Sequence, residues 1–354
     1  MLIYSLQVMG IEFIHRCHDG EGYDLCLATS PLICVHMHFV FAEDCVPNLS
    51  PLKWMDLSRY WQCPTPDDPM YQYFVQCCEL LDDATCIIIN TSDELEKDYV
   101  EHIRETFQKD VLTIGPVLPN WCFNDHTEGQ IPSHNIRPSL WIEDRSCFQW
   151  LDSQPEKSVL YVSLGSVAIL TIEQFTELAL GLELCQQPIL WVVRADLMND
   201  KTPIGFPDGY LDLMRKHSCF VSWAPQKEVL FHRAIGGFLT HHGWNSTMES
   251  LAAGVPMLGW PYFADQMING RLCADLWNVA LKFDKPKKAL IGREEVDEKV
   301  RLLMQSKSVI RENVEQCKKI LHQGISGGGS SSLHFKQVLK ICLSTPSENF
   351  HGIR

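Results

Sequence analysis

Short apolar runs alternate with segments of helical spacing along residues 146–321, and this alternation is the main structural signal in the chain. Apolar runs bounded by turn signals predict buried strands, and apolar positions that recur every three or four residues predict amphipathic helices. The expected strands are 159–163, 189–193, 219–222, 237–240 and 256–258, and the expected helices are 171–184, 245–253, one from 265, 294–303 and 309–321. This alternation predicts a parallel sheet covered on both faces, with a ligand site at the carboxyl ends of its strands.

The first 145 residues show a weaker pattern. Two apolar runs are expected to be buried strands and two segments to be helices, the second of them capped by Asp93. The strands are 86–90 and 111–114, and the helices are 70–82 and 93–106. Residues 119–145 contain several Pro, Asn, Gly and His residues without a period, which indicates a linker. Near the C-terminus, residues 327–332 predict a flexible hinge before an amphipathic helix over 333–343.

One strand-to-helix turn has the features of a phosphate-binding site. The expected strand ends at Thr240, the turn runs from His241 to Gly243, and a helix follows. A helix N-terminus offers free backbone N–H groups and a partial positive charge, and a glycine lets a ligand approach the backbone closely. The side chains of His241, Asn245 and Ser246 belong to this turn and to the first helical turn, where they could donate to phosphate oxygens.

Groups suited to the rest of a nucleotide lie nearby in the sequence. Glu249 follows one helical turn later, and a carboxylate there suits the two hydroxyls of a ribose. Trp223 comes after another expected strand, so its flat face could stack on a base at the same edge of the sheet. Asp265 and Gln266 open a later helix, where acceptor groups suit sugar hydroxyls, although Asp265 could also be a plain helix cap.

The segment from Trp223 to Gln266 resembles the signature box of the plant secondary-product UDP-glycosyltransferases. Its Trp, Ala-Pro-Gln, Thr-His-x-Gly-Trp-Asn-Ser, Glu and Asp-Gln elements stand at matching spacings. Flanking segments are also similar to this family, and the resemblance covers most of residues 45–345. Those segments are 47–52, 89–95, 144–152 and 161–166.

The resemblance implies a role for each matching residue. Trp223 would stack on uracil, whose edge would pair with the Ala224 backbone. Gln226 and Glu249 would hold the ribose. Ser166, His241, Asn245 and Ser246 would bind the diphosphate, and Trp244, Asp265 and Gln266 would bind the hexose. Gly243 and Tyr262 complete the expected UDP-sugar site.

Two positions of the box have a further consequence. A glutamine at its last position, Gln266, implies a preference for glucose over galactose as the transferred sugar. His242 occupies a position where the family usually has cysteine, so we expect altered packing there but an intact backbone cradle.

The family's architecture implies an α/β protein with two Rossmann-like domains that face a cleft, the GT-B type, with the first domain incomplete. The expected boundaries are a partial acceptor-side domain over 1–121, a linker over 122–145 and a UDP-sugar-binding domain over 146–330. Residues 331–354 would carry a last helix that packs back on the first domain. The implied reaction is a single inverting displacement that moves a hexose, expected to be glucose, from UDP to a hydroxyl of a small lipophilic acceptor. The expected acceptor is a phenolic, a terpenoid or a hormone.

The family's general base is a histidine in an early Gly-His-x-x-Pro-like turn, and this turn is missing from the chain. We therefore expect an N-terminally truncated chain that lacks the base. Asp24 is a weak candidate for the aspartate that orients the base, and the remaining candidate bases, His15, His18, His36 and His38, have flanks that match nothing in the family. An alternative function is thus a non-catalytic protein that binds UDP-sugar.

Composition limits the kinds of binding partner and the cellular location that we expect. The formal net charge of −14 argues against nucleic acid or an anionic membrane as the main partner. The 15 cysteines form no CxxC pair, which favours a reducing compartment and therefore the cytoplasm. No apolar run is long enough to span a bilayer. We expect no cofactor and no metal, with UDP-sugar as co-substrate. A nicotinamide enzyme is a weak third possibility, because no Gly-x-Gly-x-x-Gly follows a strand.

Overall fold

The computed structural model describes about two thirds of the chain, including nearly all of the region with alternating strands and helices. The described residues are 11–16, 23–27, 69, 72, 84–123, 143–165, 170–193, 198–199, 202–203, 206–207, 209–262, 265–283, 290–305 and 308–343. The chain divides into two compact units, one of residues 1–118 with 317–354 and one of residues 119–316.

The second unit is built on a six-stranded sheet in the order β12-β11-β10-β5-β6-β9, and every neighbouring pair is parallel. The strands are β5 (Val159–Ser163), β6 (Ile189–Val192), β9 (Ser218–Val221), β10 (Ile235–Thr240), β11 (Met257–Gly259) and β12 (Ala280–Lys282). All residues of β5, β10 and β11 are buried, as expected for parallel strands covered on both faces. The predicted parallel sheet is confirmed.

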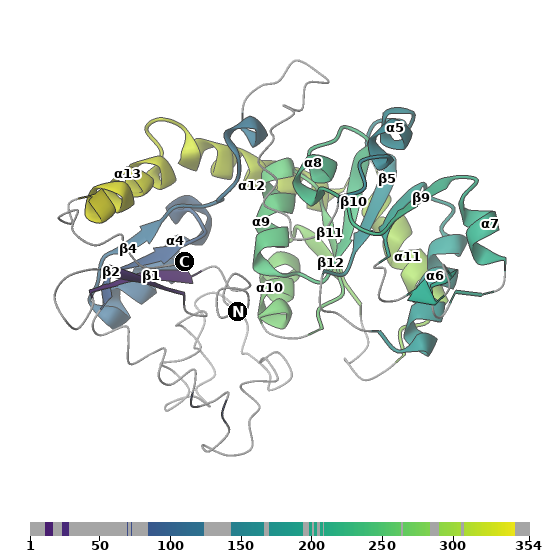
Figure 1. Ribbon diagram of the computed structural model, residues 1–354, viewed down its shortest axis with the longest axis horizontal. Helices are drawn as coiled ribbons and strands as arrows, with labels where there is room; N and C mark the ends of the chain where they lie inside the picture. Colours follow the sequence, from purple (N-terminus) through teal and green to yellow (C-terminus); the bar gives the residue numbers. More distant parts are fainter. Residues whose placement is uncertain are drawn as a thin grey trace, which may run out of the picture. The chain divides into compact units, whose positions relative to one another are not determined.

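Helices cover both faces of this sheet. Figure 1 shows α8, α9 and α10 on one side of the sheet and α6 and α11 on the other. The helices of this region are α5 (Cys147–Asp152), α6 (Ile172–Leu184), α7 (Tyr210–Met214), α8 (Gln226–Leu230), α9 (Trp244–Ala253), α10 (Gln266–Arg271) and α11 (Arg293–Met304). A five-residue π-helix, Leu272–Leu276, follows α10, and a two-stranded ribbon joins β7 (Met198–Asn199) to β8 (Thr202–Pro203). The sequence pattern missed β12, α5, α7 and α8 because each is too short to show a period.

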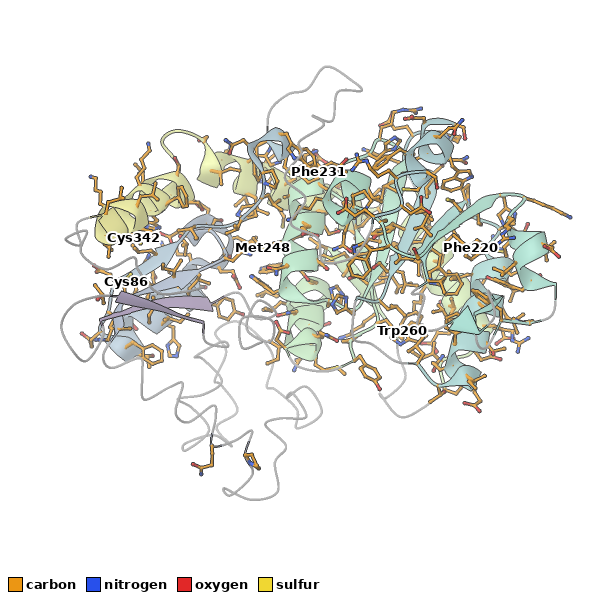
Figure 2. All side chains as sticks on the ribbon, in the orientation of Figure 1. Cys86, Phe220, Phe231, Met248, Trp260 and Cys342 are labelled. Carbon is orange, nitrogen blue, oxygen red and sulfur yellow. The ribbon has the colours of Figure 1, made fainter. Side chains whose placement is uncertain are left out.

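The core of this unit lies between the sheet and the pair α6 and α11. Trp191 of β6 stacks on Phe175 of α6 with ring centroids 5.4 Å apart, and Phe206 meets Trp191 edge-on. Val296 and Val300 of α11 belong to the same buried cluster. The cluster also takes in Phe220 and Trp260, whose side chains Figure 2 labels. Burial of these rings stabilises the strand frame that positions the loops at the carboxyl edge.

The first unit has a four-stranded sheet in the order β2-β1-β3-β4 within its described residues. The strands are β1 (Ile11–Arg16), β2 (Tyr23–Leu27), β3 (Ala84–Ile89) and β4 (Val111–Thr113), and the helix α4 (Asp93–Phe107) connects β3 to β4. β3 and β4 are parallel, whereas β1 is antiparallel to both β2 and β3. The β1–β2 hairpin was not predicted. The helix expected over 70–82 falls largely outside the described residues.

The C-terminal helices correct two details of the sequence interpretation. α12 covers Val309–Ile325, and α13 covers Ser330–Leu343. The predicted flexible hinge over 327–332 is therefore a short turn followed by the first turn of α13. Ser331 donates to the carbonyl oxygen of Gly115 over 2.7 Å, and Val338 and Ile341 pack on β3 and β4. In α4 the cap is Ser92 rather than Asp93, because the Ser92 hydroxyl accepts from the Leu95 N–H at 3.2 Å.

Candidate functional site

The carboxyl ends of three central strands lie side by side. In the sheet register, Thr240 of β10 is opposite Ser163 of β5 on one side and Gly259 of β11 on the other. The Trp260 N–H also donates to the Thr240 carbonyl oxygen over 2.7 Å. Each strand ends at the same edge, so the loops that follow β5, β10 and β11 meet there.

The N-terminus of α9 opens this edge. Gly243 is the N-cap residue of the ten-residue helix, and no side chain caps it. The first N–H groups of a helix have no partner within the helix, and such a helix end favours an anion. Asn245 is exposed and Ser246 is buried in the first turn. The expected strand-turn-helix geometry is present, with a left-handed φ of 60° at His242, and its role as a phosphate cradle stays a prediction.

The His241 ring lies close to two glycines. A Cβ atom at Gly165, in the loop after β5, would lie 2.8 Å from Nε2 of the His241 ring, and one at Gly243 would lie 2.5 Å from it. Side chains at either position would displace the ring. Burial lowers the pKa of His241 to about 4, so the imidazole is neutral at pH 7. Its Nδ1 atom is buried and has no hydrogen-bond partner. A buried polar atom without a partner beside an open helix N-terminus is the expected state of a phosphate site before its ligand binds.

A hydrogen-bonded pair lies further along α9. Gln226, at the start of α8, donates through Nε2 to Glu249 Oε2 at 2.7 Å and to Ser246 Oγ at 2.9 Å. The Tyr161 hydroxyl lies 3.5 Å from Gln226 Oε1, and Lys227 Nζ lies 4.0 Å from Glu249 Oε1. Burial raises the pKa of Glu249, while the Gln226 hydrogen bond and the Lys227 charge oppose this rise. The Glu249 carboxyl group is therefore buried, and the Gln226 amide orients it through a hydrogen bond to one of its two oxygens.

The loop that carries Trp223 is held by hydrogen bonds and an ion pair from the segment before α5. The Asp144 N–H donates to the Trp223 carbonyl oxygen over 2.8 Å. The next residue, Arg145, forms a bidentate ion pair with Glu228 of α8. Its Nη1 donates to Oε1 at 2.9 Å, and its Nη2 donates to Oε2. Ala224 is 5% exposed. The segment that precedes α5 thus holds the loop that carries Trp223 and Ala224.

The start of α10 forms a second polar group at the same edge. Gln266 Oε1 accepts from the Tyr262 N–H at 2.8 Å. Asn269 Nδ2 donates to Asp265 Oδ2 at 2.8 Å and to the His242 carbonyl oxygen at 2.9 Å. The second carboxyl oxygen, Asp265 Oδ1, is buried without a partner, and burial raises the pKa of Asp265 to about 6. Asp265 does not cap α10 with its side chain, which leaves this oxygen for another donor.

The structure thus brings most of the expected site residues to one edge of one sheet. Trp244 is also there, buried in the first turn of α9 with its ring centroid 6.2 Å from that of Trp277. Ser166 lies outside the described residues. The sequence interpretation missed Lys227 and Asn269, because their type alone carries no signal for this site. The roles assigned to these residues stay predictions.

The candidate catalytic residues belong to the first unit. The register of β1 and β2 places His15 opposite Asp24. His18, His36 and His38 lie outside the described residues. Across the described ranges, no three His, Cys, Asp or Glu residues gather as a metal site, and no helix has the length and apolar character needed to cross a membrane.

Comparisons with known proteins agree on one family. The family model described as "UDP-glucoronosyl and UDP-glucosyl transferase" matches residues 73–323. UDP-glycosyltransferase 85A1 of Arabidopsis thaliana is 36% identical over 312 residues, which are 86% of this chain and 62% of that protein. The 7-deoxyloganetic acid glucosyltransferase of Catharanthus roseus is 38% identical over 79% of this chain and 57% of its own length.

A solved structure has the same fold. The Phytolacca americana UGT2 complex with UDP-2fluoro-glucose and pterostilbene matches with a TM-score of 0.73 and 28% identity, over 88% of this chain and 69% of that one. The chain spans about six-tenths of the length of the curated relatives that it matches. The Rossmann-like α/β fold of the GT-B type is confirmed. This chain belongs to the UDP-glucuronosyl and UDP-glucosyl transferase family, among its plant UDP-glycosyltransferases.

Proposed function

We propose that this chain binds a UDP-sugar, with UDP-glucose as the expected donor, and that the protein transfers the hexose to a hydroxyl of a small lipophilic acceptor. One observation carries the proposal. The neutral His241 ring lies against Gly165 and Gly243, beside a helix N-terminus without a side-chain cap, and its buried Nδ1 atom has no partner. A relative named as a glucosyltransferase and a solved complex with a fluorinated UDP-glucose support the choice of donor.

Each part of the donor would meet a chemically matched group. The diphosphate would accept hydrogen bonds from the α9 N-terminus, Asn245 and His241. The ribose hydroxyls would donate to Glu249, and uracil would stack on Trp223 with its edge on the Ala224 backbone. The unpartnered oxygen of Asp265 would accept from a hydroxyl of the hexose, with Gln266, Trp244 and Tyr262 as neighbours.

The proposed reaction is an inverting displacement without a metal or other cofactor. The acceptor oxygen forms a bond to the anomeric carbon while the bond from that carbon to the diphosphate breaks. The electron pair goes to the diphosphate, whose growing charge the α9 N-terminus and His241 stabilise. The acceptor's proton goes to a general base, for which the described side chains offer no assignment.

The pterostilbene in the UGT2 complex supports a phenolic acceptor, and the relative that acts on 7-deoxyloganetic acid supports a terpenoid. We also propose a cytoplasmic location, which is supported by buried cysteines that form no disulfide bonds, among them Cys86, Cys122, Cys147, Cys185 and Cys317.

The test of transfer is an assay of UDP release from UDP-glucose in the presence of a pool of phenolic and terpenoid acceptors. Acceptor-dependent release supports the transferase, and a glucoside of inverted configuration at the anomeric carbon should accumulate with it. If the protein binds added UDP but forms no UDP from UDP-glucose, the alternative is favoured, in which the protein only binds the donor.

Replacement of His241 by alanine should weaken UDP binding about tenfold, because the phosphate loses one hydrogen bond from a buried, neutral donor. Isothermal calorimetry with UDP measures this change. His217 provides a matched control, since its Nε2 atom is also buried without a partner but it directly precedes β9, at the opposite edge of the sheet. His217→Ala should leave the affinity for UDP unchanged. Equal affinity in His241→Ala and the wild type would sink the assignment of the cradle.

A further inference from the structure

Lys227 lies next to the carboxyl group that would hold the ribose. Its Nζ atom is 4.0 Å from Glu249 Oε1, while the other oxygen, Oε2, accepts from Gln226 Nε2 at 2.7 Å. The two partners are consecutive residues at the start of α8, so one helical turn addresses both oxygens. The Glu249 side chain is 10% exposed, whereas that of Lys227 is 38% exposed. The lysine therefore reaches from solvent toward a buried acid.

The other groups around this acid supply no second positive charge among the described ion pairs. Tyr161 faces Gln226 from β5, and Cys122 lies close enough to interact with both Lys227 and Glu249. Glu228 is bound to Arg145 in the bidentate ion pair. Within the part of the chain that the structure describes, Lys227 is thus the cation paired with Glu249. An amide alone is a poor substitute for water around a buried carboxylate, whereas a nearby ammonium favours its ionised form.

We propose that Lys227 is a positioning residue for ribose recognition. It keeps Glu249 ionised and oriented, so that both ribose hydroxyls of a nucleoside diphosphate can donate hydrogen bonds to the carboxylate. The proposal rests on the proposed function, because it takes the ribose to lie on Glu249. A carboxylate accepts two hydrogen bonds from a vicinal diol, but a protonated carboxyl group has an O–H of its own and accepts poorly on that oxygen.

The test compares Lys227→Met with Lys227→Arg in the full chain, by calorimetry with UDP and with 2′,3′-dideoxy-UDP at pH 6 and pH 8. Lys227→Met should weaken UDP binding about fivefold at pH 8, because a partly exposed ion pair contributes modestly. The loss of affinity should be larger at pH 6. Removal of the cation raises the pKa of Glu249 further, so Glu249 becomes protonated at a higher pH in the variant than in the wild type. Lys227→Arg should bind UDP within about twofold of the wild type, because it restores the charge.

The dideoxy nucleotide distinguishes ribose recognition from effects on the diphosphate. It carries the same diphosphate, so titration of the phosphate and attraction of the lysine to it are identical in both ligands. Lys227→Met should therefore bind 2′,3′-dideoxy-UDP as the wild type does. Equal losses for the two nucleotides, or no loss for UDP, would overturn the role of Lys227 while leaving the proposed function intact. If the wild type itself fails to bind UDP, the proposed function fails and this inference fails with it.

Discussion

Gly165→Ala should reduce the affinity for UDP by a factor between about 10 and 100 and should also lower the free energy of unfolding. Gly165 has a φ of 78°, where an L-residue costs about 1–2 kcal/mol. Its new Cβ would lie 2.8 Å from both Cε1 and Nε2 of His241. A Cβ at Gly243 would also lie 2.5 Å from Nε2, so the ring already has close neighbours and we expect it to be displaced by the new methyl group. Donors displaced by fractions of an ångström from a phosphate lose much of their hydrogen-bond energy.

Gly209 provides a matched control for the backbone strain. It has a φ of 74°, and a Cβ there would meet nothing within 4 Å. Gly209→Ala should therefore lower stability by a similar strain but leave the affinity for UDP unchanged. In the double variant Gly165→Ala with His241→Ala, the clash is absent, so the two losses in affinity should be less than additive. Full additivity would contradict the assigned contact between Gly165 and His241. Calorimetry with UDP and urea denaturation measure the two quantities.

Much of the candidate site could be predicted from the sequence because it lies on one contiguous strand-turn-helix segment. Thr240, Gly243 and Asn245 are close in the sequence, so the turn that brings them together is local. Gly165 was not singled out, although it completes the His241 pocket. It comes from the loop after β5, and only the parallel pairing of β5 with β10 places it there. β5 and β10 are buried on both faces and read as continuous apolar runs, so no alternation in the sequence indicates how they pair.

The first unit shows the opposite case. β3 and β4 were predicted because each is a short, mostly apolar run. β1 contains Glu12, His15 and Arg16 among its six residues, so its pattern has no clear apolar run and its pairing with β2 was missed. The predicted cap at Asp93 was one residue late, because Ser92 and Asp93 are both good caps and only the backbone conformation decides between them.

His242→Cys should stabilise the protein increasingly as the pH falls. The His242 side chain is buried, and neither ring nitrogen has a hydrogen-bond partner. Burial, with a smaller effect of the neighbouring His241, lowers the pKa of His242 from 6.5 to about 3. Because the folded pKa lies below the unfolded one, the stability linked to this group is complete above pH 6.5 and is lost as the pH falls toward 3. A cysteine has no such linkage, so the difference in unfolding free energy should grow by about 1.4 kcal/mol per pH unit.

The comparison between variant and wild type isolates this one group. Asp265 and Glu249 have raised pKa values and act in the opposite direction, but they are present in both proteins and cancel in the difference. Urea denaturation at pH 7.5, 6 and 4.5 should therefore show a relative gain of roughly 2–3 kcal/mol for His242→Cys across the series. His232 is the control, because its Nε2 pairs with Asp152 at 3.1 Å and its Nδ1 accepts from the Ala234 N–H at 3.2 Å. His232→Cys should lower the free energy of unfolding at neutral pH, because both hydrogen bonds of the ring are lost. A difference between His242→Cys and the wild type that stays constant with pH would mean that the buried ring has found partners for both nitrogens.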